Sequence, residues 1–401
     1  MKQSLLALAV IGAFANAAHA QSSVTVYGLL DLAYTYQNKI AKPTATDPRA
    51  TDSLWSMVPG NLNGSRLGFK GTEDLSGGMK AFFKIEGGFK ADTGASAQGG
   101  RTWGRATVVG LSGGFGSVSV GRQPDPLYDL SYLGSAIVPF GLIVNNVHSL
   151  NLDRLGGERT ENSIRWDSPN MSGVRVSAIY GLGEEVGSSS AGSAFGVAGQ
   201  YTNGPFGIGA GYYQAKLGKT PADFGITNGF DCATGGGVAG DTCVKTWSVV
   251  GNYQAGPANL YASWSHVKQP LASAGAAVAP LATVFGKGVG GQFTIAGTNN
   301  DKIDTLDIGV NYALNSQLTL LAAAQQSRAN FIGASKGKLT QFNLGADYAF
   351  SKRTDVYALV ANLHATDMYN PGMFNQNGGG SVGPGADNSQ TAFQVGIRHK
   401  F

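Results

Sequence analysis

Apolar and polar residues alternate at every second position over most of this chain, and residues 22–37, SSVTVYGLLDLAYTYQ, give a representative stretch. One face of this stretch is apolar or aromatic and carries Val24, Val26, Leu30, Leu32, Tyr34 and Tyr36. The other face is mostly polar and carries Thr25, Tyr27, Asp31 and Thr35. The alternation recurs at 66–75 and 80–89. A period of two is typical of β-strands with one apolar face, so the sequence predicts an all-β protein.

The recurring pattern predicts sixteen antiparallel strands. They lie at residues 22–37, 62–74, 79–91, 101–112, 116–123, 159–169, 173–184, 192–203, 205–217, 245–255, 257–268, 302–314, 316–328, 337–350, 353–366 and 389–401. Tight turns rich in Gly, Asn, Ser and Pro alternate with long irregular loops along the chain. The long loops lie at 37–61, 91–100, 123–158, 185–191, 218–244, 269–301, 329–336 and 367–388. Short turns at one rim and long loops at the other are typical of a transmembrane β-barrel.

The first twenty residues, MKQSLLALAVIGAFANAAHA, have the three parts of a secretory signal peptide. Lys2 supplies the positive charge, residues 5–14 form the apolar run, and Ala18-His19-Ala20 is a small-residue cleavage site. We therefore predict a signal peptide at 1–20 and one barrel domain at 21–401.

Composition alone leaves two classes open. Charged residues make up 13% of the chain, against about 25% in soluble domains, and 60 of the 401 residues are Gly. After the signal peptide no apolar stretch reaches the ~18 residues of a spanning helix. A secreted all-β protein and an outer-membrane barrel both fit. In the first the apolar strand face forms a shared core, and in the second it faces lipid while the polar face lines a wet lumen.

Strand length and closure favour the barrel. A strand core of about 10 residues rises roughly 33 Å and, tilted near 45°, covers about 23 Å, close to the ~25 Å apolar band of such barrels. Sixteen strands leave room for an aqueous channel. The chain ends on AFQVGIRHKF, with Phe393, Val395 and Ile397 on one face and a terminal Phe401. We expect this segment to be the closing strand, with Phe401 in an aromatic girdle.

Several segments make the chain resemble the Gram-negative general porins of the β-proteobacterial type. They are SSVTVYGLLDLAY, SRLGFKGTEDLSGGMKAFFKIE, GLSGGFGSVSVGRQ, NSIRWDSPNMSGV and the terminal Phe401. The resemblance implies a sixteen-stranded barrel that is usually trimeric, with the loop after the fifth strand folded into the lumen as a constriction. It also implies that the terminal aromatic strand, ending at Phe401, is the signal that the barrel assembly machinery reads.

The loop at 124–158 is the predicted constriction. It is unusually apolar, and an exposed loop of this composition would be costly. Folding inward would bury Tyr132, Leu133, Ile137, Val138 and Phe140 against the wall; the alternative is a surface loop that packs on a neighbouring subunit. Relatives of this family often carry Pro-Glu-Phe-Gly-Gly-Asp at the tip. Residues 138–142 read Val-Pro-Phe-Gly-Leu here, without either carboxylate.

Basic residues predicted for the wall face this loop. The resemblance makes Arg66, Arg122 and Arg165 the counterparts of the family's wall arginines. Simple alternation from Val118 and Val120 would point Arg122 outward, unless Gly121 permits a bulge or the strand faces a subunit contact. Further basic residues share the lumen face of their predicted strands: Lys70, Lys80, Lys84, Arg101 and Arg105. Four acids toward the two ends of the loop can offset part of this charge: Asp125, Asp129, Asp153 and Glu158.

The sequence predicts no catalytic or metal site. The histidines at 148, 266, 364 and 399 are isolated, and no G-x-S-x-G or H-E-x-x-H motif occurs. Cys232 and Cys243 are the only cysteines, and in an exported chain they predict a disulfide that closes a loop. We expect no cofactor, no metal and no nucleic-acid partner.

These features predict a porin of the outer membrane that passes small hydrophilic solutes and ions passively and prefers anions, and the resemblance implies that it is a homotrimer. The expected partners are outer-membrane lipid, lipopolysaccharide and the barrel assembly machinery. Two other classes stay open: a non-conducting surface or adhesive barrel, and a barrel enzyme of the outer membrane.

Overall fold

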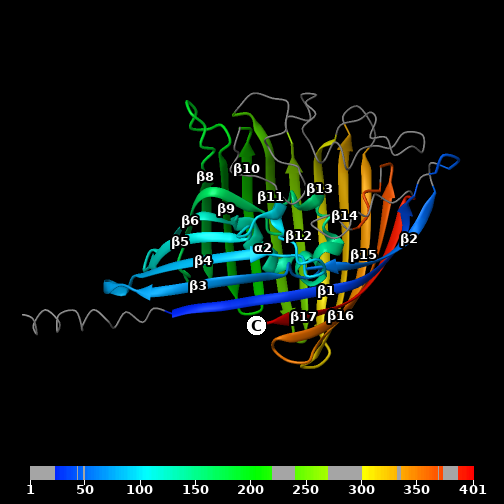
Figure 1. The fold of residues 1–401 in the computed structure, drawn as a ribbon, viewed down its shortest axis with the longest axis horizontal. Helices are drawn as coiled ribbons and strands as arrows, with labels where there is room; N and C mark the ends of the chain where they lie inside the picture. Colours follow the sequence, from blue (N-terminus) through cyan, green and yellow to red (C-terminus); the bar gives the residue numbers. More distant parts are fainter. Residues whose placement is uncertain are drawn as a thin grey trace, which may run out of the picture.

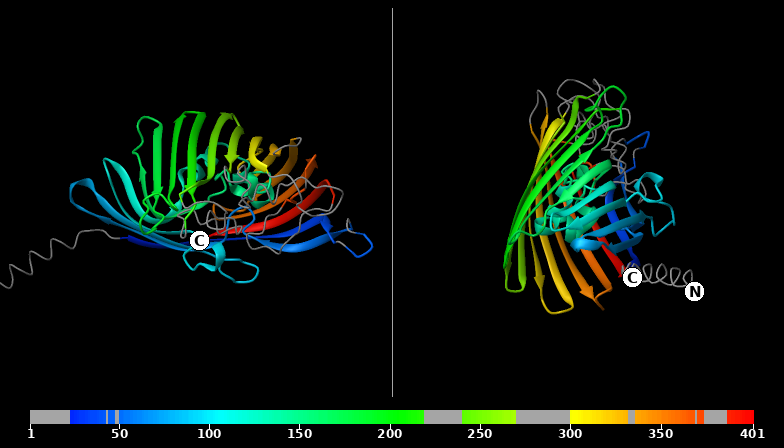
Figure 2. Two further views of the ribbon diagram at one scale, coloured as in Figure 1. Left: turned by 90° about the horizontal axis from the view of Figure 1, so that it is seen from above. Right: turned by 90° about the vertical axis from the view of Figure 1, so that its left-hand side faces the viewer.

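The structure is a computed structural model that describes residues 23–42, 44–47, 50–218, 240–269, 300–331, 336–368, 370–373 and 387–401. The predicted signal peptide at 1–20 lies outside these ranges. All the strands belong to one antiparallel sheet that curves until its ends meet (Figures 1 and 2).

In the described part of the chain, seventeen strand segments make up the sheet. They are β1 (Ser23–Ala41), β2 (Thr51–Pro59), β3 (Arg66–Asp74), β4 (Lys80–Gly88), β5 (Ala106–Gly113), β6 (Gly116–Pro124), β7 (Arg159–Asp167), β8 (Val174–Gly181), β9 (Ala194–Asn203), β10 (Phe206–Lys216), β11 (Thr242–Ala255), β12 (Ala258–Lys268), β13 (Asn300–Ala313), β14 (Leu318–Phe331), β15 (Gly337–Ala349), β16 (Thr354–Thr366) and β17 (Ser389–Lys400).

The barrel nevertheless has sixteen strands around its circumference, because β2 and β3 are two halves of one strand. Both pair with the long β1: β3 pairs along its first half, from Ser23 to Leu29, and β2 along its second half, from Leu32 to Ala41. The closed sixteen-stranded barrel predicted from the sequence is therefore confirmed. The prediction of an irregular loop over 37–61 is wrong for residues 51–59, which form β2. β2 and the predicted strand 62–74 form one strand of the barrel with an interruption at 60–65.

β1 and β17 close the barrel. Their register runs from Leu29 opposite Lys400 to Gln37 opposite Ala392. Phe401 continues the ladder: its amide N–H donates to the Gly28 carbonyl at 3.1 Å, and the Gly28 N–H donates to the Phe401 carbonyl at 3.0 Å. Its ring covers Gly28 so closely that a Cβ added there would lie 2.2 Å from the ring. The chain thus ends on a residue that completes the sheet.

The apolar faces of the strands point outward. In β17, Phe393 and Val395 are each 46% exposed, whereas Gln394 between them is fully buried. This is the reverse of a soluble core, and it matches the outward apolar band of a membrane barrel. Within the described residues, no single helix is long and apolar enough to cross a membrane.

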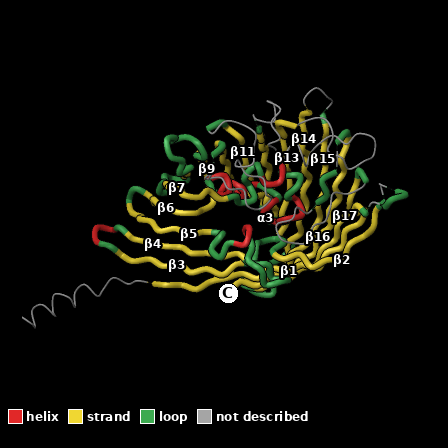
Figure 3. Tube along the Cα trace, turned by 45° about the horizontal axis from the view of Figure 1, so that its top comes forward, coloured by secondary structure: helices red, strands yellow, loops and turns green. Residues whose placement is uncertain are grey.

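A helical segment packs against the inner face of the wall. It comprises α2 (Pro126–Gly134), α3 (Ile137–Phe140) and short 3-10 turns at Gly141–Val144 and Ser149–Asn151. Figures 2 and 3 show it within the curve of the strands. Its segment 126–144 is the most apolar part of the connection between β6 and β7.

Alternate glycines on β10 leave room on the inner face of the wall for side chains of α2. A Cβ added at Gly207, Gly209 or Gly211 would lie within 3.1 Å of a leucine of α2. The leucines are Leu133, Leu130 and Leu127, in that order. Spacing of three along the helix puts these side chains on one face, and spacing of two along the strand puts the glycines on the inner face. The sequence GIGAG at 207–211 therefore forms the surface of the wall on which the leucines of α2 pack.

Candidate functional site

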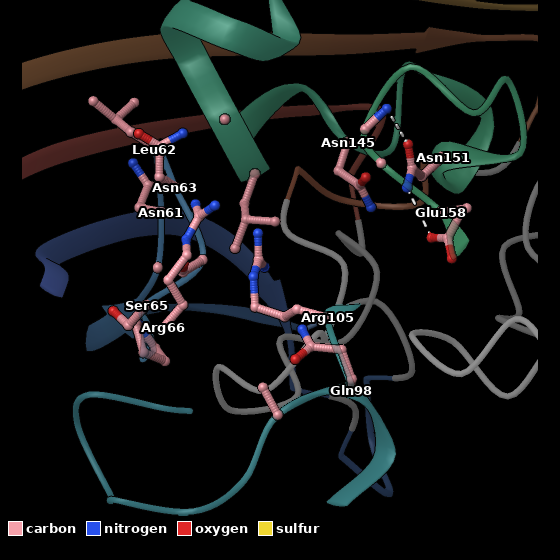
Figure 4. Close-up of a pocket in the computed structure, with 18 of the residues that line it drawn as sticks. Asn61, Leu62, Asn63, Ser65, Arg66, Gln98, Arg105, Asn145, Asn151 and Glu158 are labelled. Atoms are coloured by element: carbon pink, nitrogen blue, oxygen red, sulfur yellow. Dashed lines mark hydrogen bonds between the residues drawn. The ribbon is translucent and has the colours of Figure 1, made fainter. Parts of the chain in front are cut away.

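A cavity of about 450 Å³ lies between the helical segment and the wall. Its lining comes from residues 59–66 around the interruption, residues 96–100, the segment 128–145 and residues 156–159, together with Phe89, Lys90, Arg105 and Asn151. Figure 4 shows part of it, with Arg66 and Arg105 beside each other. We call this cavity the throat.

Three arginines form the basic side of the throat. Each is oriented through its Nε: Arg66 donates to the Gly64 carbonyl at 3.0 Å, Arg105 to the Glu86 carboxylate at 2.8 Å, and Arg159 to the Arg105 carbonyl at 3.0 Å. Arg105 and Arg159 are buried, and Arg66 is half-buried. Holding each guanidinium by one edge fixes its position while the planar fork keeps further donors for other acceptors.

Acidic groups offset only part of this charge. Glu86 is buried beneath Arg105, accepts a hydrogen bond from Tyr27 at 2.8 Å and lies 3.2 Å from the Lys84 ammonium. Glu158 lines the throat and accepts a hydrogen bond from Asn151 at 2.8 Å. Lys90 also lines the throat. Among the described residues, four basic side chains therefore line this cavity against one carboxylate, Glu158, with a second carboxylate, Glu86, below it.

Lys70 and Lys84 lie further toward the rim of short turns. They are directly opposite each other on β3 and β4, on the same inward face as Arg66. The Lys70 ammonium lies 5.4 Å from the centre of the Tyr27 ring, within range of a cation–π contact. Lys80, at the start of β4, pairs with Asp74 at 2.9 Å. The basic face predicted from parity thus continues below the throat.

Arg122 lies on the outward face of the wall instead. It is directly opposite Thr107, in the row of outward pairs that Val120–Val109 continues. Gly121 has φ 128° and the register shifts beside it, but this bulge does not turn Arg122 inward. Glu161 accepts a hydrogen bond from Arg122 at 2.9 Å and also pairs with Arg101. These two arginines form an ion-pair cluster away from the throat, which corrects their expected place at the constriction.

Arg165 points inward but its charge is neutralised. Its guanidinium contacts Asp129 of α2 and donates to Asp167 at 2.6 Å. Asp125 is buried and has a structural role: one oxygen accepts the Leu127 N–H at the start of α2, and the other accepts the Arg154 Nε at 2.8 Å. Asp125 and Asp129 therefore fix the helical segment to its surroundings and do not face the three throat arginines.

The tip of the helical segment fills space instead of presenting charge. Phe140 is fully buried, and Gly141 has φ 61°. A Cβ at Gly141 would lie 1.9 Å from the Asn61 carbonyl oxygen, which accepts the Leu142 N–H at 2.8 Å. The tip is thus locked against the strand interruption, and only glycine fits at the contact.

His148 anchors the rear of the segment between two carboxylates. Its Nδ1 lies 2.7 Å from Asp153 Oδ2, and its Nε2 lies 3.4 Å from Asp307 Oδ2 on β13. The same Asp307 oxygen accepts the Ala136 N–H at 2.6 Å, and Ser265 of β12 donates to Asp153. Burial disfavours the imidazolium, but the two carboxylates outweigh burial and raise the pKa of His148 to about 10.

The charged His148 should stabilise the barrel below pH 6.5, its ordinary pKa, and this contribution should fade as pH rises through 10. We expect the melting temperature of the wild type to fall by several degrees over that window. His148→Gln should melt lower at pH 6.5 and lose most of the dependence. His364→Gln, on an exposed outward position, is the control and should keep it. Parallel melting curves for the wild type and His148→Gln would contradict the anchor.

Arg159, His148 and the interruption at 60–65 were not predicted as site residues. Arg159 stands at the first position of a predicted strand with the parity of Arg165, so alternation could have found it. The others depend on contacts between segments far apart in the sequence. Within the described residues, no cluster of three or more His, Cys, Asp or Glu side chains could hold a metal ion.

A closed barrel with an apolar outside and a basic inner cavity defines a channel-type barrel of the outer membrane. A family model described as Gram-negative porin matches residues 7–367. An outer membrane porin of Bordetella pertussis is 26% identical over 419 residues, and outer membrane porin protein 32 of Delftia acidovorans is 31% identical over 414 residues, each match covering 100% of both chains. The chain belongs to the Gram-negative porin family, is located in the outer membrane, and is not an enzyme.

Solved structures agree. An anion-selective porin from Comamonas acidovorans superimposes with a TM-score of 0.69 at 26% identity, covering 95% of this chain and 100% of that chain. OmpT of Vibrio cholerae, solved in a trimer form, superimposes with a TM-score of 0.62 at 16% identity, covering 95% and 99%. The second likeness concerns the fold alone.

Proposed function

We propose that this porin is a homotrimeric channel through which small hydrophilic solutes and ions diffuse passively, with a preference for anions. The excess of basic residues around the throat carries this proposal. Arg66, Arg105, Arg159 and Lys90 line the cavity, and Glu158 is the one carboxylate among the lining residues that the structure describes. Low-dielectric walls focus the field of such charges and raise the local concentration of anions.

The helical segment is the proposed constriction. Its helices occupy the inner side of the wall, and Asp307, Gln341 and Thr246 of three different strands hydrogen-bond to it. A segment fixed at several points around the barrel narrows the lumen to a defined opening. The nearby anion-selective porin supports the choice of anions for this chain.

Strand lengths support the trimer. Strands β4 to β8 have only 8 or 9 residues, whereas β11, β13 and β14 have 14. Nine residues rise about 30 Å and, tilted near 45°, cover about 21 Å, short of the ~25 Å apolar band. A wall too short to span the bilayer fits better against neighbouring subunits than against lipid. We therefore infer that β4 to β8 face the trimer interior.

The export and loop features stay predictions. They comprise the signal peptide at 1–20, the single barrel domain at 21–401 and the disulfide between Cys232 and Cys243. Cys243 is buried in β11, and Cys232 lies outside the described residues. Contact with the barrel assembly machinery through the terminal strand is likewise proposed.

Single-channel recording in a planar bilayer tests the channel. The purified protein should open stable, ohmic conductance steps; their absence would favour a non-conducting surface barrel, and hydrolytic turnover without conductance would favour a barrel enzyme.

Cysteine modification tests the constriction. Tyr132 is exposed to the throat, so Tyr132→Cys treated with a negatively charged methanethiosulfonate reagent should lose a large part of its conductance. Val186→Cys, fully exposed in the connection between β8 and β9, is the control and should not respond. Equal responses at both positions would contradict the constriction.

A further inference from the structure

A second cavity, of about 510 Å³, lies on the other side of α2 from the throat. Tyr128 and Tyr132 of α2 line the throat, whereas Asp129 and Leu130 of the same helix line the second cavity. The rest of its lining comes from β6 to β9, at the ends of these strands that lie next to the tight turns, and from the turn between β7 and β8. We call this cavity the short-turn pocket.

The wall of the short-turn pocket is formed by side chains on the inner face of the strands. Asp167 of β7 lies opposite Ser177 of β8, and Arg175 of β8 lies opposite Gln200 of β9. Because residues two apart on a strand share a face, Asp167 has the inward direction of Arg165, and Arg175 has that of Ser177. Arg175 is thus a diagonal neighbour of Asp167 on the lumen side, a relation that long side chains can bridge.

One side of this pocket carries more negative than positive charge. The Arg165 guanidinium contacts Asp129 and donates to Asp167 at 2.6 Å, so one positive group faces two carboxylates. Arg165 contacts Oδ2 of Asp129, and Oδ1 of Asp129 has no hydrogen-bond partner among the described residues. The Asp129 and Asp167 side chains are 44% and 33% exposed, respectively. An ammonium group can therefore reach this acidic side from the lumen.

The other side is basic and consists of Arg175, which is exposed and has no ion pair within the described part of the chain. Asp167 is its diagonal neighbour, but both oxygens of Asp167 already accept hydrogen bonds from Arg165. A guanidinium has five N–H donors in a planar fork that matches a carboxylate. Arg175 is therefore available to bind the carboxylate of a solute.

The remaining lining suits a small polar solute. Ser117, Ser177 and Gln200 line the pocket, and their side chains make no hydrogen bond within the residues that the structure describes. Pro126 and Leu130 add an apolar side. The volume lies in the range of roughly 300–1,000 Å³ that is usual for small-molecule sites. The pocket thus has hydrogen-bonding groups left for the side chain of a solute that the two charged sides hold.

We propose that the short-turn pocket binds zwitterionic α-amino acids, with the solute carboxylate on Arg175 and the solute ammonium on Asp129. A simple anion is attracted by Arg175 but repelled by the excess carboxylate, and a simple cation meets the reverse. A solute that carries both charges gains from both sides. Because α2 separates this pocket from the throat, the proposal does not depend on the anion preference of the throat.

Saturation-transfer difference NMR on the folded protein in detergent tests this site, with L-glutamine as the probe. Arg175→Gln should bind L-glutamine about tenfold more weakly, as expected for the loss of a hydrogen bond between charged groups. The control Arg353→Gln removes the same charge from an exposed position in the tight turn between β15 and β16 and should bind like the wild type. N-Acetyl-L-glutamine lacks the ammonium and L-glutaminamide lacks the carboxylate, so each should bind the wild type about tenfold more weakly than L-glutamine does.

Equal affinity of Arg175→Gln and the wild type for L-glutamine, with both folded as heat-resistant barrels, would overturn the proposal. So would equal affinity of the wild type for L-glutamine and either analogue, which would mark a site for one charge only. A second measurement applies even if Arg175→Gln fails to fold. L-Glutamine should slow the reaction of Ser177→Cys, in the pocket, with a methanethiosulfonate reagent, but not that of the fully exposed Val186→Cys. Equal reaction rates of Ser177→Cys with and without L-glutamine would also refute the site.

Discussion

Replacing Arg66, Arg105 and Arg159 together by Ser should reduce the preference for chloride over potassium by about tenfold at 0.1 M salt, because clefts of one charge shift local ion concentrations by that order. The three guanidinium groups account for most of the basic charge around the throat, and their removal leaves Glu86 and Glu158 opposed mainly by Lys84 and Lys90. The measurement is the zero-current potential in a KCl gradient. A potential equal to that of the wild type would contradict the role of the throat arginines.

Arg122→Ser gives the matched control. Arg122 was expected at the constriction but lies on the outer face beside Glu161. Its removal changes the net charge by the same amount per residue and should leave the potential unchanged. The preference of the wild type should also weaken with salt, since the Debye length falls from about 10 Å at 0.1 M to about 3 Å at 1 M. A change in the zero-current potential caused by Arg122→Ser would show that this residue faces the lumen.

The barrel could be predicted because its rule is local. Alternation of period two fixes which side chains face outward. Apart from β2, which lies in a predicted loop, the described strands lie within a few residues of the predicted ones, as with β10 at Phe206–Lys216 against 205–217. Turn length then separated the two rims. Neither inference requires information on which strands pair, because each strand pairs with the next one in the sequence.

The charge pattern of the throat could be predicted only in part. Parity correctly put Arg66, Lys70 and Lys84 on the inner face, but it cannot tell a free arginine from a paired one. Arg165 is neutralised by Asp129, which α2 brings to it from 36 residues away. That pairing follows from how the helical segment seats on the wall, and no local pattern in the sequence encodes it.

The interruption at 60–65 escaped prediction for a similar reason. Its function lies in contacts with distant segments: Asn63 accepts a hydrogen bond from Arg398 at 2.6 Å, and the Asn63 N–H donates to Asp31 at 2.7 Å. Asn61 receives the tip of the helical segment at Leu142. In the sequence this stretch reads as an ordinary loop, GNLNGS. Its role emerges only when the barrel closes and brings β1, β17 and the helical segment to it.

The absence of acids at residues 138–142 is consistent with the contact between the tip of the helical segment and the interruption at 60–65. The tip is used for packing, through Phe140 and Gly141, and for the hydrogen bond from Leu142 to Asn61. The tip therefore secures the segment, while the wall arginines supply the charge.

Deleting Phe401 should remove most of the folded barrel from the outer membrane while leaving export intact. Two backbone hydrogen bonds to Gly28 close the ladder at the chain end, worth about 2 kcal/mol together, and the ring covers the glycine that no larger residue could replace. Without them β1 and β17 have frayed edges where closure begins, and unassembled chain should accumulate in the periplasm.

The measurement is the amount of heat-resistant barrel in outer-membrane fractions. Phe401→Trp should keep most of the aromatic cover, whereas Phe401→Ala, which retains both backbone hydrogen bonds, should have an intermediate effect. Phe350→Ala removes another exposed aromatic residue, next to the turn between β15 and β16, and should assemble normally. If the deletion yields as much heat-resistant barrel as Phe350→Ala, the terminal residue has no special part in closure, and assembly depends on the rest of β17.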